Sequence, residues 1–227
     1  MVRITEVFMA TSQFNPIEYW EHRHRELKDD HRNVGNRGLT SAQNFRMLCN
    51  KALRIARELG ALNLPHGSSV LDAGCGAGVV ANLLADADFD VTGIDCSSTA
   101  LESARIDSKA SFERGELDSF DMGRVYDAVL CLDVLYHVVT DEEWRNSLRN
   151  LARHMKFQGH LLIIEYFEKG TQKSADYVCW RSAAQYADVF QTLGLTLVDM
   201  RDFLYPATKF NKTLLVVRRA GAAALSG

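Results

Sequence analysis

Residues 70–78 read VLDAGCGAG and form the most informative stretch of this chain. A short apolar strand carries the acid Asp72 near its end, and three glycines follow at alternate positions before a helix that begins near Val79. Glycines at this spacing allow the backbone to approach a ligand closely. A second acid, Asp95, ends the next apolar strand, residues 91–95. Two carboxylates beside one glycine turn favour a positively charged nucleoside as the ligand, because they would repel a bare phosphate.

The composition indicates one globular domain with a helical extension. A chain of 227 residues, of which 47% are hydrophobic, can bury one large core, and no break in composition separates two full domains. We therefore expect an N-terminal helical cap over residues 1–60, a ligand-binding core over residues 61–219, and a disordered tail of small residues over 220–227.

The charge and hydropathy of the chain argue against several kinds of partner. A formal net charge of -3 gives no electrostatic footprint for nucleic acid or for an anionic membrane. No apolar run approaches the roughly 20 residues that span a bilayer, and the N-terminus lacks a signal-peptide pattern, so we expect a cytoplasmic protein. The five cysteines stand at wide and irregular spacing, which fits neither a disulfide framework nor a zinc site, and we expect no bound metal.

Apolar strands alternate with helices from residue 69 onward. The runs 128–132 and 161–164 are almost continuously apolar, which is typical of parallel strands that are covered on both faces. The alternation predicts an α/β fold with a doubly wound sheet. Two later apolar segments, 195–200 and 213–217, have no helical period and are expected to pair antiparallel at the edge of the sheet. The expected strands are 69–73, 91–95, 110–114, 125–132 and 160–166, and the expected helices are 79–87, 98–106, 141–156 and 182–193.

Two helices are expected before the sheet begins. The order Asn15-Pro16-Ile17-Glu18 is typical of a helix N-terminus. The charged residues 21–32 that follow, with their three histidines, are expected mostly on a solvated face, and the spacing of these histidines fits no familiar metal site. A capping box at residues 40–43 predicts the start of a second helix, which we expect to end with Gly60 as its C-cap.

The glycine turn has one common competitor. Residues 76–81 also satisfy the G-x-G-x-x-A fingerprint of dinucleotide-binding proteins, in which an acid on the second strand binds ribose. Asp72 argues against a dinucleotide, because a carboxylate beside a pyrophosphate would repel it. A nicotinamide-dependent oxidoreductase therefore remains the less favoured alternative.

Four stretches together resemble the class I S-adenosylmethionine-dependent methyltransferases over roughly residues 44–218. The resemblance implies a Rossmann-like, seven-stranded, mostly parallel sheet with an antiparallel last strand and an N-terminal helical cap. It also implies S-adenosylmethionine as cofactor and S-adenosylhomocysteine as product. The stretches are VLDAGCGAG at 70–78, VTGIDCS at 91–97, ERGELDSF at 113–120 and YDAVLCLDVLYHV at 126–138.

The same resemblance implies the residues that contact the cofactor. Asp72 would orient the methionine end, Asp95 would accept both ribose hydroxyls, and either Glu116 or Asp118 would accept from the adenine amino group. The backbone of Leu117 would donate to the adenine ring, and aromatic residues such as Tyr19 and Trp20 would cover the cofactor. The expected contacts are Tyr19, Asp72, Ala73, Gly74, Cys75, Gly76, Asp95, Cys96, Glu116, Leu117 and Leu132.

The acceptor is expected at the carboxyl edge of the sheet, where the family places it. If the acceptor is a hydroxyl, His137 is the first candidate for the base because a histidine titrates in the useful range, and Glu165 with Tyr166 comes next. Segments 166–180 and 202–212 should line the acceptor pocket. Their aromatic residues include Tyr177, Trp180, Tyr205 and Phe210.

Several subclasses of methyltransferase do not fit the sequence. Residues 132–135 read LDVL and lack the proline-containing tetrad of the enzymes that methylate nucleic-acid amino groups. The metal-dependent catechol type has an Asp-Asn pair after its fifth strand, where this chain has Glu165-Tyr166. We therefore expect a small-molecule methyltransferase, monomeric or homodimeric, that acts on oxygen. Nitrogen is the close alternative, and a catalytically silent cofactor-binding subunit stays open.

Overall fold

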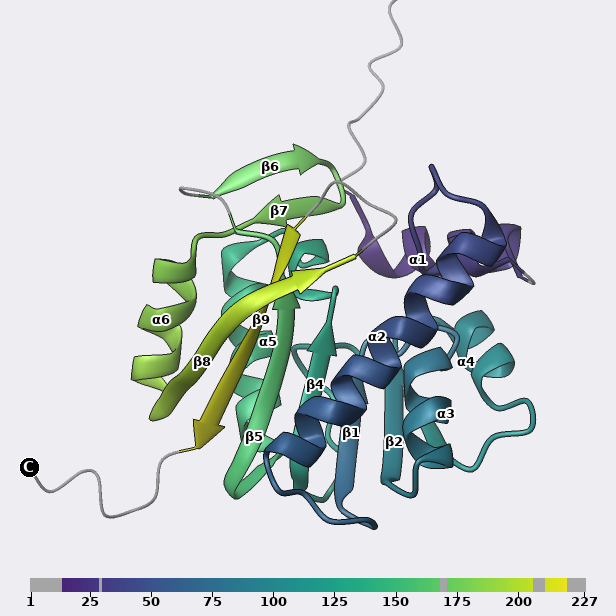
Figure 1. The fold of residues 1–227 in the computed structure, drawn as a ribbon. Helices are drawn as coiled ribbons and strands as arrows, with labels where there is room; N and C mark the ends of the chain where they lie inside the picture. Colours follow the sequence, from purple (N-terminus) through teal and green to yellow (C-terminus); the bar gives the residue numbers. More distant parts are fainter. Residues whose placement is uncertain (1–13, 29, 168–170, 206–210, 220–227) are drawn as a thin grey trace, which may run out of the picture.

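The computed structural model describes residues 14–28, 30–167, 171–205 and 211–219 (Figure 1). Phe210, the tail 220–227 and the first 13 residues of the expected cap lie outside these ranges. Among the described helices, none is long and apolar enough to cross a membrane.

A seven-stranded sheet in the order β3-β2-β1-β4-β5-β9-β8 forms the centre of the molecule. The first five strands in this order are parallel, and β9 is antiparallel to both of its neighbours. The predicted fold class and the predicted antiparallel pair at the sheet edge are therefore confirmed. The strands are β1 Ser69–Ala73, β2 Asp90–Asp95, β3 Ser111–Arg114, β4 Tyr126–Leu132, β5 Met155–Glu165, β8 Leu195–Leu204 and β9 Asn211–Arg219.

Helices cover both faces of the sheet. In Figure 1, α2 crosses the front of the sheet beside α3, and α5 lies behind it. The helices are α1 Pro16–Glu26, α2 Ser41–Ala61, α3 Val79–Asp86, α4 Ser98–Ala104, α5 Asp141–Arg153 and α6 Ala183–Thr192, with short 3-10 turns η1 His31–Asn33 and η2 Leu135–His137.

The apolar runs of the central strands fill two separate cores. Along β4, Leu130 and Leu132 pack with α2 and α3, whereas Val129 and Cys131 pack with α5 and α6. Successive side chains of a strand point to opposite faces, so a strand that is covered on both faces needs apolar residues at every position. This is why the central strands read as continuous apolar runs.

The helix starts follow the predicted caps. Thr40 and Gln43 form a capping box at the start of α2, and the Asn15 side chain accepts from the first backbone N–H groups of α1. The predicted C-cap of α2 was wrong by two residues, because the helix continues past Gly60 to Ala61 and its C-cap is Leu62. Asn63, with φ of 58°, adopts the left-handed conformation that follows the helix.

A two-stranded hairpin was not predicted. Strands β6 Gln172–Ala175 and β7 Val178–Trp180 pair antiparallel within the segment that was expected only to line the acceptor pocket. Figure 1 shows the hairpin above the carboxyl edge of the sheet, and β7 contacts η2. The hairpin thus forms one wall over the end of β4.

Candidate active site

A cavity of about 500 Å³ opens at the carboxyl edge of the sheet. Strands β1 and β4 are neighbours there, but the chain continues from β1 toward β2 and from β4 toward β5, on opposite sides. The loops after two such strands diverge and leave a crevice. Residues of α1, α2, the β1, β2 and β4 loops and the β6-β7 hairpin line it.

The glycine turn after β1 presents its backbone to this cavity. Gly74 and Gly76 have φ of +83° and +54°, a conformation that side chains disfavour. A Cβ at Gly74 would lie 2.5 Å from a methyl carbon of Val134, and one at Gly76 would lie 2.4 Å from a methyl carbon of Val34. The site has no room for side chains here, so a ligand can lie against the peptide groups themselves.

The carboxylate of Asp95 is fixed by two backbone donors. Gly76 donates its N–H to Oδ2 at 2.8 Å, and Ser97 donates its N–H to Oδ1 at 2.9 Å. Each carboxylate oxygen retains acceptor capacity, so two neighbouring hydroxyls could donate to the two oxygens. This arrangement fits the diol of a ribose.

Asp72 is a buried carboxyl that faces the cavity. Its side chain is 3% exposed and forms no hydrogen bond to another described residue. Burial, opposed by Lys51 and assisted by the nearby Asp95, raises its pKa to about 7. A cationic ligand group would stabilise the charged form of this carboxyl, so Asp72 fits the ammonium of S-adenosylmethionine.

The structure distinguishes the two acids proposed for adenine. Cys96 and Gly115 line both the main cavity and an adjoining cavity that Glu116 also lines, whereas Asp118 lines neither. Leu117 lines the main cavity. Burial raises the pKa of the Cys96 thiol to about 12, so this side chain stays neutral and offers an apolar surface. Glu116 is therefore the better placed acid.

His137 lies in the 3-10 turn after β4 and lines the cavity. Its Nδ1 is 2.8 Å from the carbonyl oxygen of Tyr177, which only accepts, so Nδ1 carries the proton of the neutral ring and Nε2 carries a lone pair. Trp20 packs against the ring with centroids 4.7 Å apart. Burial lowers the pKa of His137 to about 4, so the ring is neutral at physiological pH.

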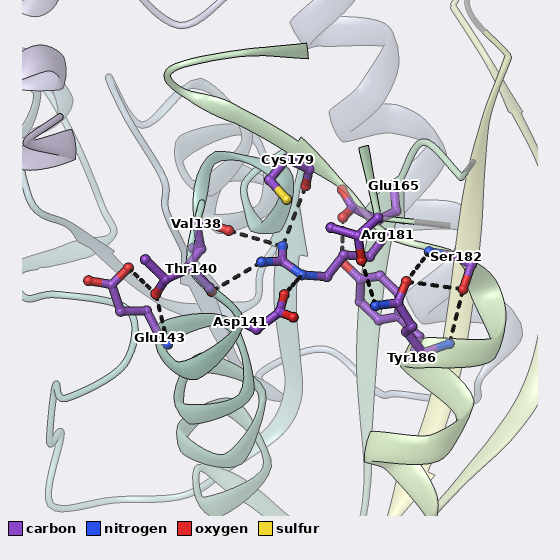
Figure 2. A network of polar contacts seen from close by, with 11 residues as sticks. Val138, Thr140, Asp141, Glu143, Glu165, Cys179, Arg181, Ser182 and Tyr186 are labelled. Atoms are coloured by element: carbon purple, nitrogen blue, oxygen red, sulfur yellow. Dashed lines mark hydrogen bonds and ion pairs between the residues drawn. The ribbon is translucent and has the colours of Figure 1, made fainter. Parts of the chain in front are cut away.

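Glu165, the second proposed base, does not line the cavity. Its side chain is 1% exposed and accepts a hydrogen bond from the Tyr186 hydroxyl of α6, as Figure 2 shows. Burial raises its pKa to about 8. The structure thus places this carboxyl in the core below the site, because strand alternation at the end of β5 points it toward α6. Tyr166, the next residue, lines the cavity instead.

The buried Arg181 side chain in Figure 2 stabilises the loop that carries His137. The Arg181 side chain is 1% exposed and donates to the backbone carbonyls of Val138 and Thr140, both at 3.0 Å, and to Asp141 at 2.9 Å. These contacts connect the segment after β7 to the start of α5. Arg181 therefore fixes the backbone that immediately follows His137.

The structure brings most of the predicted site residues to the one cavity. Tyr19 is an exception, because it stacks on Tyr177 with centroids 4.8 Å apart and does not line the cavity, whereas Trp20 does. Ala73 is fully buried and also lies outside the lining. The predicted residues that line the cavity are Asp72, Gly74, Cys75, Gly76, Asp95, Cys96, Leu117, Leu132, His137, Tyr166, Tyr177, Trp180 and Tyr205.

Four polar side chains of the site, three of them cationic, were not predicted. Arg23 and His24 on α1 were expected on a solvated face, and this was wrong, because they are 5% and 2% exposed. Arg23 donates to the backbone carbonyls of Arg32 and Gly35, so tertiary contacts bury it. Lys51 and Lys212 also line the cavity. Among the described residues, no group of three or more His, Cys, Asp or Glu side chains could hold a metal ion.

Comparison with known proteins agrees with this geometry. The magnesium protoporphyrin IX methyltransferase of Synechocystis, solved with bound S-adenosylmethionine, has a similar fold, with a TM-score of 0.72 at 19% identity over 93% of this chain and 100% of that one. The N-methyltransferase NodS of Bradyrhizobium japonicum gives a TM-score of 0.66 at 17% identity over 91% and 99%. A family model described as a methyltransferase domain matches residues 70–159. Residues 70–159 thus match a methyltransferase domain, and the chain has the fold of these solved methyltransferases.

Curated relatives match a similar share of the chain. The ubiquinone biosynthesis O-methyltransferase of Rickettsia typhi is 34% identical over 99 residues, which are 41% of this chain and 39% of the relative. The mitochondrial ubiquinone biosynthesis O-methyltransferase of Schizosaccharomyces pombe is 29% identical over 109 residues, 44% of this chain and 39% of the relative. The match thus covers about two fifths of the length of these relatives.

Proposed function

We propose that this chain is a methyltransferase that transfers a methyl group from S-adenosylmethionine to an oxygen atom of a small-molecule acceptor. The observation that carries the proposal is the pair Asp72 and Asp95, which flank a glycine-rich turn at one end of the cavity. The curated relatives are O-methyltransferases, and we extend this activity to the chain as part of the proposal.

The chain's own residues would bind and orient the cofactor. Asp95 would accept from the ribose hydroxyls, Asp72 would face the methionine ammonium, and Glu116 would lie nearest to the adenine amino group. When bound, S-adenosylmethionine supplies an electrophilic methyl group on a positively charged sulfur. Such an electrophile needs little covalent help, so the protein contributes mainly by positioning the acceptor.

His137 would remove the proton of an acceptor hydroxyl. The hydrogen bond from Nδ1 to the Tyr177 carbonyl leaves the lone pair at Nε2, and the buried ring is neutral before the reaction. Nε2 would accept the proton of the acceptor oxygen, which becomes acidic as this oxygen takes the methyl group and the methyl–sulfur bond breaks, so that S-adenosylhomocysteine leaves with the electron pair on its sulfur. Trp20 and Tyr177 would exclude water from the ring.

Two measurements test this proposal. Calorimetry should show S-adenosylhomocysteine binding and no comparable binding of NADH, which separates a methyltransferase from a nicotinamide-dependent oxidoreductase. Incubation of a metabolite extract with methyl-labelled donor should then give a product whose label is attached to oxygen. Binding of NADH alone would overturn the assignment, label on nitrogen would overturn the choice of oxygen, and cofactor binding with no labelled product would indicate a silent subunit.

A further inference from the structure

Two lysine ammonium groups share one carboxylate at the cavity wall. Lys51 on α2 donates to Asp133 Oδ2 at 2.6 Å, and Lys212 at the start of β9 donates to Asp133 Oδ1 at 2.6 Å. Lys212 also donates to the Tyr136 hydroxyl at 2.9 Å. Burial would raise the pKa of Asp133, but the two ammonium groups outweigh burial and hold it well below its usual value. Asp133 is therefore charged, and this lysine cluster carries one net positive charge.

The lysine cluster has more donors than acceptors. Each ammonium has three N–H donors, and the described residues accept two from Lys212 and one from Lys51. The side chains of Lys51 and Lys212 are only 8% and 17% exposed, and both line the cavity. A buried cation without a matching anion is costly. The unused donors therefore suit an anionic group of a ligand.

The lysine cluster lies at the acceptor end of the cavity. Asp95 follows β2 and Asp133 follows β4, and β1 lies between these strands. With strands about 4.8 Å apart, the two carboxylates are separated by about 10 Å across the sheet. His137 follows Asp133 in the same loop, and Lys212 precedes Thr213, which pairs with Glu165 at the end of β5. The cluster is therefore on the His137 side of the site.

The charges of the whole cavity lead to the same conclusion. Burial lowers the pKa of both His24 and His137, so the two rings are neutral. Arg37 pairs with Glu26, which does not line the cavity, so the other lining cations equal the carboxylates in number when Asp72 is ionised, and a bound sulfonium cofactor with its amino acid portion would add one positive charge. These lining residues are Arg23, Lys51 and Lys212 against Asp72, Asp95 and Asp133.

We propose that the methyl acceptor is an organic acid whose carboxylate binds Lys51 and Lys212. This inference rests on the proposed function and specifies its substrate class. A carboxylate carries one negative charge, which equals the net charge of the lysine cluster, whereas a phosphate monoester would exceed it. Aromatic side chains of Trp20, Tyr177 and Trp180 line the same cavity, so an acid with a ring would match the rest of the wall.

The test compares matched acids and amides on the same protein. The chain is first saturated with S-adenosylhomocysteine and then titrated with benzoate, benzamide, 3-phenylpropanoate, 3-phenylpropanamide and phenyl phosphate, with binding followed by calorimetry or ligand-observed NMR. At least one carboxylate should bind about tenfold or more tightly than its amide, because charge-assisted hydrogen bonds distinguish the two. Equal binding of acid and amide, stronger binding of phenyl phosphate, or no carboxylate binding at millimolar concentration would overturn the inference.

A lysine variant tests whether the preference for acid over amide depends on the lysine cluster. Lys212→Met should reduce the preference for acid over amide by about tenfold, and Lys109→Met is the control, because Lys109 is exposed and pairs with Asp86 far from the cavity lining. The comparison of acid and amide on the unmodified chain stands even if Lys212→Met does not fold. Failure of S-adenosylhomocysteine to bind in the first step would refute the proposed function, whereas normal cofactor binding without acid preference would refute only this inference.

Discussion

Replacing Asp72 with Asn should stabilise the cofactor-free protein at alkaline pH and leave it almost unchanged at acid pH. Burial raises the pKa of the Asp72 carboxyl from 3.8 to about 7. Between pH 3.8 and about pH 7, the Asp72 carboxyl is protonated in the folded protein and ionised in the unfolded chain. The stability that this proton gives is complete below the unfolded pKa, and it is lost as the pH rises through the folded pKa.

The size of the effect follows from the two pKa values. The pKa difference between 3.8 in the unfolded chain and about 7 in the folded protein corresponds to about 4 kcal/mol. Above the folded pKa, the buried ionised carboxyl lowers the free energy of unfolding by this amount. Asn has the shape of the protonated acid and cannot ionise, so Asp72→Asn avoids this cost. We expect the free energy of unfolding to rise by about 2 to 4 kcal/mol at about pH 9, and by less than about 1 kcal/mol at about pH 4.

Urea unfolding of the wild type and the variant at both pH values measures this difference, and contributions of all other groups cancel. Asp86→Asn is the control, because Asp86 is 62% exposed and pairs with an exposed lysine. Its effect should stay below about 0.5 kcal/mol at either pH. The same Asp72→Asn protein should bind S-adenosylhomocysteine more weakly. A stability change that is equal at the two pH values, or a loss of stability at about pH 9, would refute the account of this buried carboxyl.

Three further predictions concern the other groups of the site. His137→Ala should lower the methyl transfer rate by at least about tenfold with nearly unchanged S-adenosylhomocysteine affinity, and the wild-type rate at saturating S-adenosylmethionine should show no fall on acidification near pH 6.5, because burial lowers the pKa of this ring to about 4. Asp95→Asn should weaken S-adenosylhomocysteine binding by about tenfold to a hundredfold in calorimetry, since one ribose acceptor becomes a donor. Arg181→Met should lower the free energy of unfolding by about 3 kcal/mol in urea titrations, because it leaves the carbonyls of Val138 and Thr140 without their buried donor, whereas the exposed Arg149→Met should have little effect.

The parts of the site that the sequence predicted are local in the chain. Asp72 and the glycines stand within a few residues of each other, and Asp95 ends the adjacent strand, so strand order alone brings them together. The layered fold was predictable for the same reason, because the periodicity of each segment shows which faces are covered. The hairpin β6-β7 was not predicted because its strands are too short to show an alternation of apolar and polar residues.

The parts that the sequence did not predict depend on contacts between distant segments. Lys51 and Lys212 lie 82 and 79 residues from Asp133 in the chain, and neither stands in a recognisable motif. Arg23 and His24 belong to a helix whose sequence predicts a solvated face, and the arginine is buried where the loop at residues 32–35 accepts its hydrogen bonds. Glu165 looked suitable because it ends a strand, but which face it points to depends on strand register.

The position of β9 inside the sheet connects the completion of the fold to the charge balance of the site. This strand comes last in the described chain, yet it lies between β5 and β8, and it brings Lys212 to Asp133. A growing polypeptide that has not yet reached Asn211 thus lacks an interior strand and one of the two countercharges of a buried carboxylate. Productive binding and cooperative folding should therefore appear together, once residues 211–219 have been synthesised, and shortened products that stop before this strand should acquire neither.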